Sequence, residues 1–252
     1  MSPAQGSLYL AVYAPALVGD DGRPLAIVHG MERAVPGLRL EWTTSERNDL
    51  IPLRHRDEWV ATTGTDNGFP FLCNDDDNRV VTLTGWENAM GLAAGGPPHF
   101  EVHATLPQDA AGIAAAADAL EAVAEAARAF WGHASPSGHG ETVAQMYRHP
   151  GDERPVPPHG LPWLKHSRYI PAPEFPHYLG WLNYWSAAAA QAIGFPDPAR
   201  DAELLTRARR TPSGGWVVQL TATPLDDDTP AHMDALKRAY ERFPAIGGRD
   251  SP

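Results

Sequence analysis

The stretch YLGWLNYWSAAAAQAIGF, residues Tyr178–Phe195, contains five aromatic side chains, a run of alanines and a glycine near its end. Trp181, Tyr184 and Trp185 fall on one face at helical spacing. Gly194, which a Phe-Pro pair follows, is typical of a residue that ends a helix. The stretch therefore predicts a buried helix that belongs to the core of the protein.

Hydrophobic periodicity and turn residues predict further elements on both sides of this helix. The expected strands are Leu8–Tyr13, Leu38–Thr43, Glu58–Thr62, Arg79–Thr84, His99–Leu106 and Trp216–Ala222. The expected helices are Pro24–Val35, Asp109–Trp131, Glu141–Tyr147, Pro198–Arg210 and a last one that begins at Pro230, after Thr229 as N-cap. These elements predict an α+β protein in which helices pack on a mixed or antiparallel sheet.

The strand predicted at His99–Leu106 shows a clean alternation of apolar and polar residues. One face would carry Phe100, Val102, Ala104 and Leu106, and the other His99, Glu101, His103 and Thr105. Because side chains alternate across a strand, this pattern predicts one buried face and one polar face.

The chain is expected to form a single domain, residues 1–252, in three parts. The first half covers about residues 1–132. Residues 133–177 hold six of the 11 histidines and nine of the 25 prolines, which predicts a long irregular excursion over the surface. The segment 178–248 completes the fold.

Two segments look alike, because HFEVHATLPQD and GWVVQLTATPLDD each read as a strand, a proline and an acidic turn before a helix. One interpretation is a weak internal duplication that gives two related strand–helix halves. The other is the ordinary similarity of strand–loop–helix units.

The composition, with 43% hydrophobic and 20% charged residues, is typical of a folded soluble protein. No apolar run approaches the roughly 20 residues that a membrane-spanning helix needs, and no basic segment precedes the first apolar run. Cys73 is the only cysteine, which excludes an internal disulfide and suits a reducing compartment. We therefore expect a cytoplasmic protein without a membrane partner.

The net charge of −11 lies almost entirely in the first half. Residues 1–132 carry a net charge of −10, and residues 133–252 a net charge of −1. Because phosphate binding needs a basic surface, nucleic acid is not an expected partner. The acidic half suits either a basic protein partner or ordinary solubility.

The sequence contains no phosphate-binding loop, no zinc motif and no nucleophile elbow, so we expect no catalytic residue, metal or cofactor, and no enzyme activity. The alternative is a metal-binding protein or enzyme that uses the histidines of the segment 133–177. These are His133, His139, His149, His159, His166 and His177. Their irregular spacing favours surface histidines in a proline-rich loop instead.

Acidic and tryptophan residues in the first half are the candidates for contact with a protein partner. They are Glu58, Trp59, Asp75, Asp76, Asp77, Trp86 and Glu87. The three aspartates do not follow the alternating calcium-loop pattern and are expected at a solvated hairpin tip. Each tryptophan is either an interface anchor or a core residue.

The run Gly180-Trp-Leu-Asn-Tyr-Trp-Ser186 resembles the Gly-Trp-Leu-x-Tyr-x-Ser motif of the bacterial immunity protein 52 family. The Gly-led apolar strand GGWVVQLTATP and the Thr-Pro-x-His opening of the last helix agree with that family in order. A related bacterial family of unknown function resembles residues 178–248 more closely. The resemblance implies a non-enzymatic antitoxin that occludes the active site of its cognate toxin, typically a nuclease with a basic substrate groove.

Overall fold

The computed structural model describes residues 6–19, 21–45, 47, 49–63, 68–90, 94–147 and 157–249. Within these ranges, ten strands form one sheet in the order β3-β2-β4-β5-β6-β1-β7-β8-β10-β9, and every neighbouring pair is antiparallel. The strands are β1 (Ser7–Pro15), β2 (Trp42–Thr44), β3 (Leu50–Pro52), β4 (Gly68–Cys73), β5 (Thr82–Asn88), β6 (His99–Pro107), β7 (Trp131–Pro136), β8 (Leu182–Trp185), β9 (Ala208–Arg210) and β10 (Trp216–Gln219).

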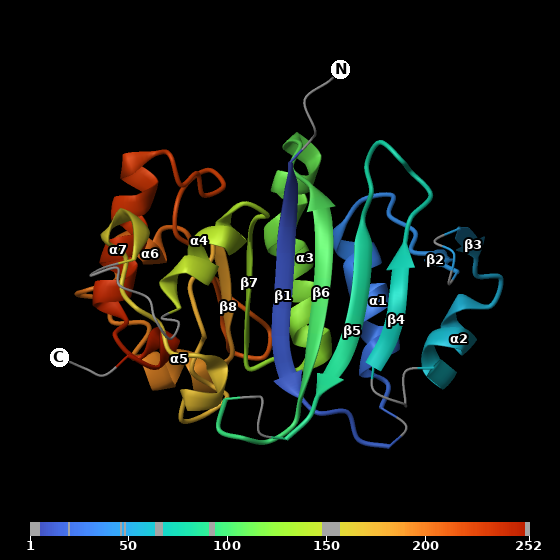
Figure 1. Ribbon diagram of the computed structural model, residues 1–252, viewed down its shortest axis with the longest axis horizontal. Helices are drawn as coiled ribbons and strands as arrows, with labels where there is room; N and C mark the ends of the chain where they lie inside the picture. The colour runs from blue at the N-terminus through green and yellow to red at the C-terminus, as the bar shows by residue number, and fades with distance from the viewer. Residues whose placement is uncertain are drawn as a thin grey trace.

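The α-helices of the described residues lie around this sheet, which confirms the predicted α+β class (Figure 1). They are α1 (Arg23–Ala34), α2 (Arg56–Thr63), α3 (Ala110–Ala127), α4 (His139–Met146), α5 (Ala187–Ile193), α6 (Ala202–Leu205) and α7 (Pro230–Arg242). None of them is both long enough and apolar enough to span a membrane.

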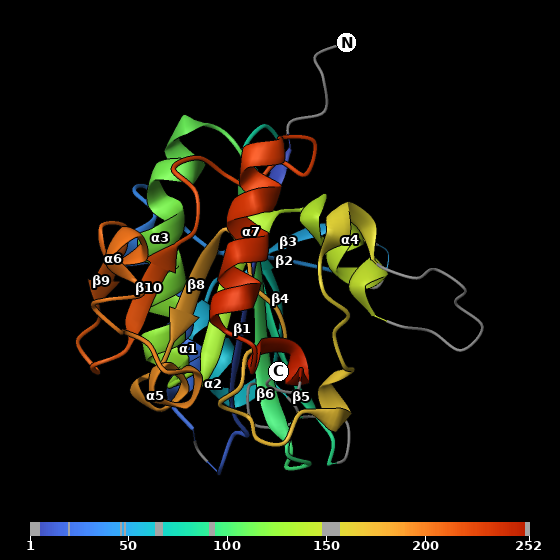
Figure 2. The same cartoon turned by 90° about the vertical axis from the view of Figure 1, so that its left-hand side faces the viewer.

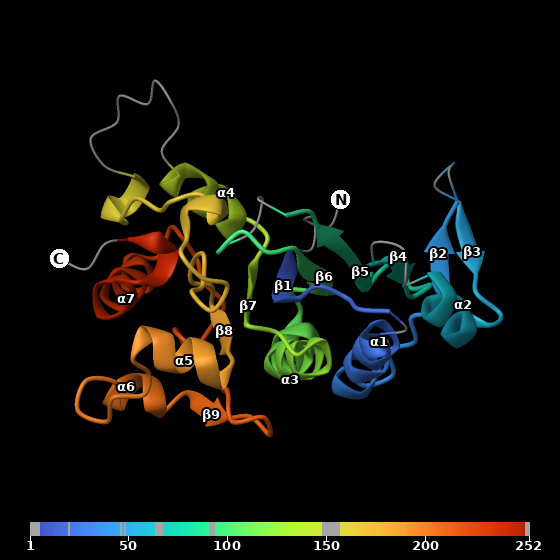
Figure 3. The ribbon, with the colours of Figure 1, turned by 90° about the horizontal axis from the view of Figure 1, so that it is seen from below.

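Helices α1 and α3 cover one face of the sheet, which we call the first face (Figure 3). The alternating side chains of β1 and β6 point into this layer, with Leu10 and Val102 fully buried. Leu120 of α3 and Met31 of α1 complete the core from the other side. The alternation predicted at His99–Leu106 is therefore confirmed, with the apolar set on the first face.

Among the described residues, α-helices cover the opposite, second face over β7, β8 and β10. Helices α4, α5 and α7 contribute to a second hydrophobic core there, together with residues of the segment 161–179 (Figure 2). Trp131, Trp185, Tyr240 and Phe243 are among its fully buried side chains. The two cores lie on opposite faces of one continuous sheet.

Over β5, β6 and the first part of β1, no described helix lies on the second face (Figures 1 and 3). We call this surface the open face. It is formed by Ser7, Tyr9, Thr82, Thr84, Trp86, Glu101, His103 and Thr105, which alternate with buried core residues along their strands.

The helix predicted over Tyr178–Phe195 is wrong in its first half. Leu182–Trp185 is the strand β8, and the helix α5 begins only after Ser186, whose side chain accepts a hydrogen bond from the Ala189 N–H at 3.1 Å. Both faces of β8 are buried, so its sequence shows no alternation and cannot be told from a buried helix by periodicity. The predicted end is confirmed, because Gly194 has a left-handed backbone with φ of 71°.

Two further predictions fail for local reasons. The strand expected at Glu58–Thr62 is the helix α2, whose first turn carries acidic residues that suit the helix dipole. The helix expected to run to Trp131 ends at Arg128, and the following residues form β7. Gly132 of β7 is a point of close contact with β1, since a Cβ there would lie 2.6 Å from Val12 Cγ1.

The segment 133–177 is therefore not a wholly irregular excursion, because it contains the end of β7 and the helix α4. The short helix expected near Glu141–Tyr147 is confirmed by α4. The predictions at Leu38–Thr43 and Pro198–Arg210 are correct only in part, since β2 begins at Trp42 and the second range holds α6 and β9.

Candidate functional site

A row of aromatic and histidine side chains runs along the second face, from β5 on the open face to the segment before β8. The Trp86 ring is stacked on His103, with centroids 4.1 Å apart and planes 30° apart. Next to His103 lies Tyr9, whose hydroxyl is hydrogen-bonded to His103 Nδ1. The row continues to His133, whose ring centroid lies 6.1 Å from that of Tyr9, and then to Tyr178.

Strand register explains why these rings meet. Ala11 of β1 lies opposite His103 of β6 on one side and opposite His133 of β7 on the other. The methyl group of Ala11 leaves room between the two imidazoles, and the neighbouring side chain on the same face, Tyr9, lies against both. A single small residue in the central strand thus sets the spacing of the row.

Glu101 connects two histidines of β6 through its carboxylate. Its Oε1 lies 2.6 Å from His99 Nε2, and its Oε2 lies 3.1 Å from His103 Nε2. A carboxylate accepts hydrogen bonds, so both Nε2 atoms act as donors and His103 Nδ1 accepts from the Tyr9 hydroxyl. The open face therefore carries an ordered polar network beneath its exposed tryptophan.

Burial keeps three histidines of the second face neutral at physiological pH. It lowers the pKa of His103 to about 4 and the pKa of His133 and His177 to about 3. The three rings therefore serve as uncharged packing and hydrogen-bonding groups, and not as cations. The expectation of surface histidines in this part of the chain is wrong for His133, His139 and His177, which are buried.

Among the described residues, no group of three or more His, Cys, Asp or Glu side chains is placed to hold a metal ion. His139 instead joins α4 to the segment before α7, because its Nδ1 lies 3.2 Å from Asp227 Oδ1 and its Nε2 lies 3.2 Å from the Leu179 carbonyl oxygen. His149 lies outside the described residues.

The acidic turn Asp75–Asp77 connects β4 to β5 and is fully exposed, as the predicted hairpin tip requires. A hollow of about 420 Å³ lies between this turn and the open face. Asp77 and the exposed Val80 line it on one side, and Ser7 and Thr105 on the other. The turn and the open face therefore belong to one surface.

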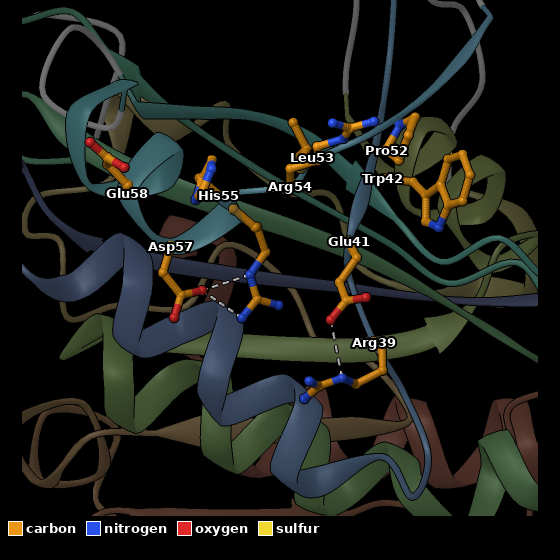
Figure 4. Close-up of a pocket in the computed structure, with 10 residues that line it drawn as sticks. Arg39, Glu41, Trp42, Pro52, Leu53, Arg54, His55, Asp57 and Glu58 are labelled. Carbon is orange, nitrogen blue, oxygen red and sulfur yellow. Dashed lines mark hydrogen bonds and ion pairs between the residues drawn. The ribbon is translucent and has the colours of Figure 1, made fainter.

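Glu58 lies elsewhere, at the β2–β3 end of the sheet. It lines a groove of about 590 Å³ with Asp57, Glu41, Trp42 and three arginines (Figure 4). Several of these charges are already paired: Arg56 Nη2 lies 2.7 Å from Asp57 Oδ1, and Arg39 Nε lies 3.3 Å from Glu41 Oε1. The groove thus has mixed and largely compensated charge.

The structure brings only part of the predicted contact set together. Trp86 and the three aspartates border the open face, whereas Glu58 lies in the groove of Figure 4. Trp59 packs against the first core, and the Glu87 carboxylate accepts a hydrogen bond from the Leu17 N–H at 2.5 Å. Both are therefore engaged within the protein.

Sequence reasoning did not single out Tyr9, His103 or Thr105, which form the centre of the open face. The polar residues that alternate with apolar ones along His99–Leu106 could have indicated His103 and Thr105. The exposed position of Trp86 points to the same surface. Exposed aromatic rings with a polar rim around them are typical of protein-binding surfaces.

Comparison with known proteins places the chain in a family. A family model described as a domain of unknown function, DUF5953, matches residues 19–251, well beyond the segment 178–248 in which the resemblance to a family of unknown function is best. No curated protein sequence matches the chain. The structure of the Pseudomonas aeruginosa T6SS protein PA0821 is similar, with a TM-score of 0.53 and 14% identity over 96% of this chain and 74% of that chain. At this identity the likeness concerns the fold alone, whereas the family match spans nearly the whole sequence: the chain belongs to the DUF5953 family.

Proposed function

We propose that this protein is an immunity protein that binds and neutralises a cognate bacterial toxin, and that it acts by binding and not by catalysis. The sequence resemblance to immunity protein 52 supports this proposal. A fold shared with a T6SS protein is consistent with a role in competition between bacteria. The observation that carries the proposal is the open face, where Trp86 is 38% exposed on a sheet surface that no described helix covers.

The open face has the composition of a binding surface. Trp86 is held flat by its stack on His103, and His103 is held in turn by Tyr9 and Glu101. A tryptophan fixed in this way loses little conformational freedom when a partner covers it, which favours tight binding. Thr82 and Thr105, hydrogen-bonded to each other at 2.6 Å, supply hydroxyl groups beside it.

Charge indicates the kind of partner. The exposed carboxylates of Asp75, Asp76 and Asp77 border the open face, and the hollow beside Asp77 is large enough for a long basic side chain. The proposed partner is therefore a toxin whose binding surface is basic, as the substrate groove of a nuclease is. Occlusion of that groove by an acidic surface would exclude nucleic acid.

The experiment is a co-expression rescue test with the toxin gene next to the gene of this protein. Wild-type protein is expected to restore growth, and W86A to restore it poorly, because a buried interface tryptophan contributes about 2 kcal/mol or more to binding. The matched control is W42A, which removes a half-buried tryptophan from the groove of Figure 4. It is expected to rescue like the wild type.

Two outcomes would contradict the proposal. Failure of the wild-type protein to rescue growth would refute the immunity role, and equal loss of rescue in W86A and W42A would refute the open face as the binding surface. A stoichiometric transition metal in the purified protein would favour the rival function, a metal-binding protein or enzyme that uses the histidines of the segment 133–177.

A further inference from the structure

A small apolar cavity lies beside the open face, at the end of β1 and the start of β6. Its volume is about 140 Å³, and its walls include Tyr13, Phe130 and three prolines, Pro97, Pro98 and Pro173. The wall segment near Pro97 is tied to the segment 167–177 by a hydrogen bond from the Gly95 N–H to the Ile170 carbonyl oxygen, 2.8 Å long. Prolines and rings change shape little, so the cavity is largely preformed.

His99 gives this apolar cavity a specific polar group. Its side chain lines the cavity, and the residue is only 6% exposed. Its Nδ1 atom is buried and has no hydrogen-bond partner among the described residues. Buried polar atoms normally have a partner, so a lone one in a cavity wall indicates a position for a ligand group.

The network of Glu101 settles which kind of group that would be. His99 Nε2 donates to Glu101 Oε1, which places a proton on Nε2; in the tautomer that carries only this proton, Nδ1 presents a lone pair. The Asn88 Nδ2 atom lies 3.3 Å from the same Nε2, but an amide nitrogen is a donor, so the Glu101 carboxylate at 2.6 Å is the acceptor for the Nε2 proton. In this tautomer His99 Nδ1 is an acceptor, and the buried atom lacks a donor among the described residues.

We propose that this cavity binds a small aromatic molecule that carries one hydroxyl or N–H group, oriented so that this group donates to His99 Nδ1. An engineered cavity of about 150 Å³ accepts benzene, so the volume here suits a single six-membered ring. Tyr13 lines the cavity, and its ring is held by stacking on Trp131, with ring centroids 4.1 Å apart. None of the named wall residues belongs to the open face, and the site touches that face through the hydrogen bond between His99 and Glu101.

The test is a titration of the full-length protein with phenol and, in parallel, with toluene, which has the same shape but no donor. Phenol is expected to bind in a 1:1 ratio with a Kd on the order of 1 mM, and about tenfold more tightly than toluene. Nitrogen NMR of the histidine side chains should show a shift of the His99 Nδ1 resonance on phenol binding, since that atom gains a hydrogen bond.

Two variants separate ligand binding from a folding defect. A16L places a larger side chain in the cavity wall and should abolish phenol binding, whereas V18L, at a neighbouring residue that is 80% exposed, should bind phenol like the wild type. H99F keeps a ring but removes the acceptor and should bind phenol and toluene equally. Equal binding of phenol and toluene to the wild type, or unchanged phenol binding in A16L, would overturn the proposal.

Discussion

The two halves of the second face differ in how far helices cover the sheet. Over β7, β8 and β10 the face is covered, and Trp131 is 1% exposed within the second core. Over β5 and β6 the same face is open, and Trp86 is 38% exposed on top of a histidine. The tryptophan of the covered half stabilises the fold, whereas the tryptophan of the open half is accessible from solvent. The covering elements, and not the residue type, decide between the two roles.

Truncation of the two tryptophans should give the largest difference between the halves. W131A is expected to lower the free energy of unfolding by about 3–5 kcal/mol, because it removes a fully buried ring and leaves a cavity. W86A should cost only about 1 kcal/mol, the contribution of one aromatic stack. Denaturant unfolding of both variants measures this difference, and similar costs would show that the open half is as much a core as the covered half.

Acid should destabilise the protein through the buried histidines. The pKa of His133 is lowered to about 3 in the folded protein, below the ordinary value near 6.5 of an unfolded chain. As the pH falls below about 6.5, the unfolded state therefore binds the proton first, and stability decreases until the pH reaches the folded pKa. Above pH 7 both states are neutral, and no contribution remains.

His133→Gln should remove one such contribution. Between about pH 7 and pH 5, stability of the wild type is expected to fall by about 2 kcal/mol more than that of the variant. The measurement is denaturant unfolding at both pH values, compared as differences so that any constant cost of the substitution cancels. An identical fall in both proteins would mean that protonation of His133 has no part in acid sensitivity.

The link between α4 and α7 holds the cover of the closed half in place. Asp227 accepts a hydrogen bond from the Thr142 hydroxyl and lies 3.2 Å from His139 Nδ1, and these contacts lower its pKa. Asp227→Asn should cost about 1 kcal/mol, the net contribution of such a hydrogen bond. Asp228→Asn, at the exposed neighbouring residue, is the control and should change the unfolding midpoint little.

The acidic turn should matter for binding and hardly at all for stability. Replacement of Asp75, Asp76 and Asp77 by asparagine is expected to change the free energy of unfolding by no more than about 0.5 kcal/mol, because all three are exposed. The association rate with the toxin should fall about tenfold at low salt and less at high salt. A rate that depends equally on salt in wild type and variant would exclude the turn from the encounter.

The cover on each half of the sheet also explains which strands could be predicted from their residue alternation. The alternation at His99–Leu106 was readable because one side of β6 is open or polar, which leaves a period of two. Leu182–Trp185 was read as a helix because both of its faces are covered, which removes that period. The open face of β6 thus leaves a period that the sequence shows, whereas the double cover of β8 removes it.

The candidate surface was only partly predictable for a different reason. Trp86 and the acidic turn stand out in the sequence, but Tyr9 and His133 become their neighbours only through the strand order β5-β6-β1-β7. That order joins residues more than 70 positions apart, as Tyr9 and His103 are. No local sequence pattern specifies such a contact, so the row of rings could not be predicted without the strand order.

Equilibrium binding of the neighbouring toxin to the W86A and W42A variants tests most directly the claim that the open half is the binding surface. Each variant removes one partly exposed tryptophan, Trp86 from the open face or Trp42 from the groove of Figure 4, and both should remain folded. The account predicts that W86A raises the Kd about 30-fold or more, whereas W42A leaves it within about twofold of the wild type. A Kd that is unchanged in W86A and raised in W42A would place the toxin in the groove of Figure 4 and contradict the account.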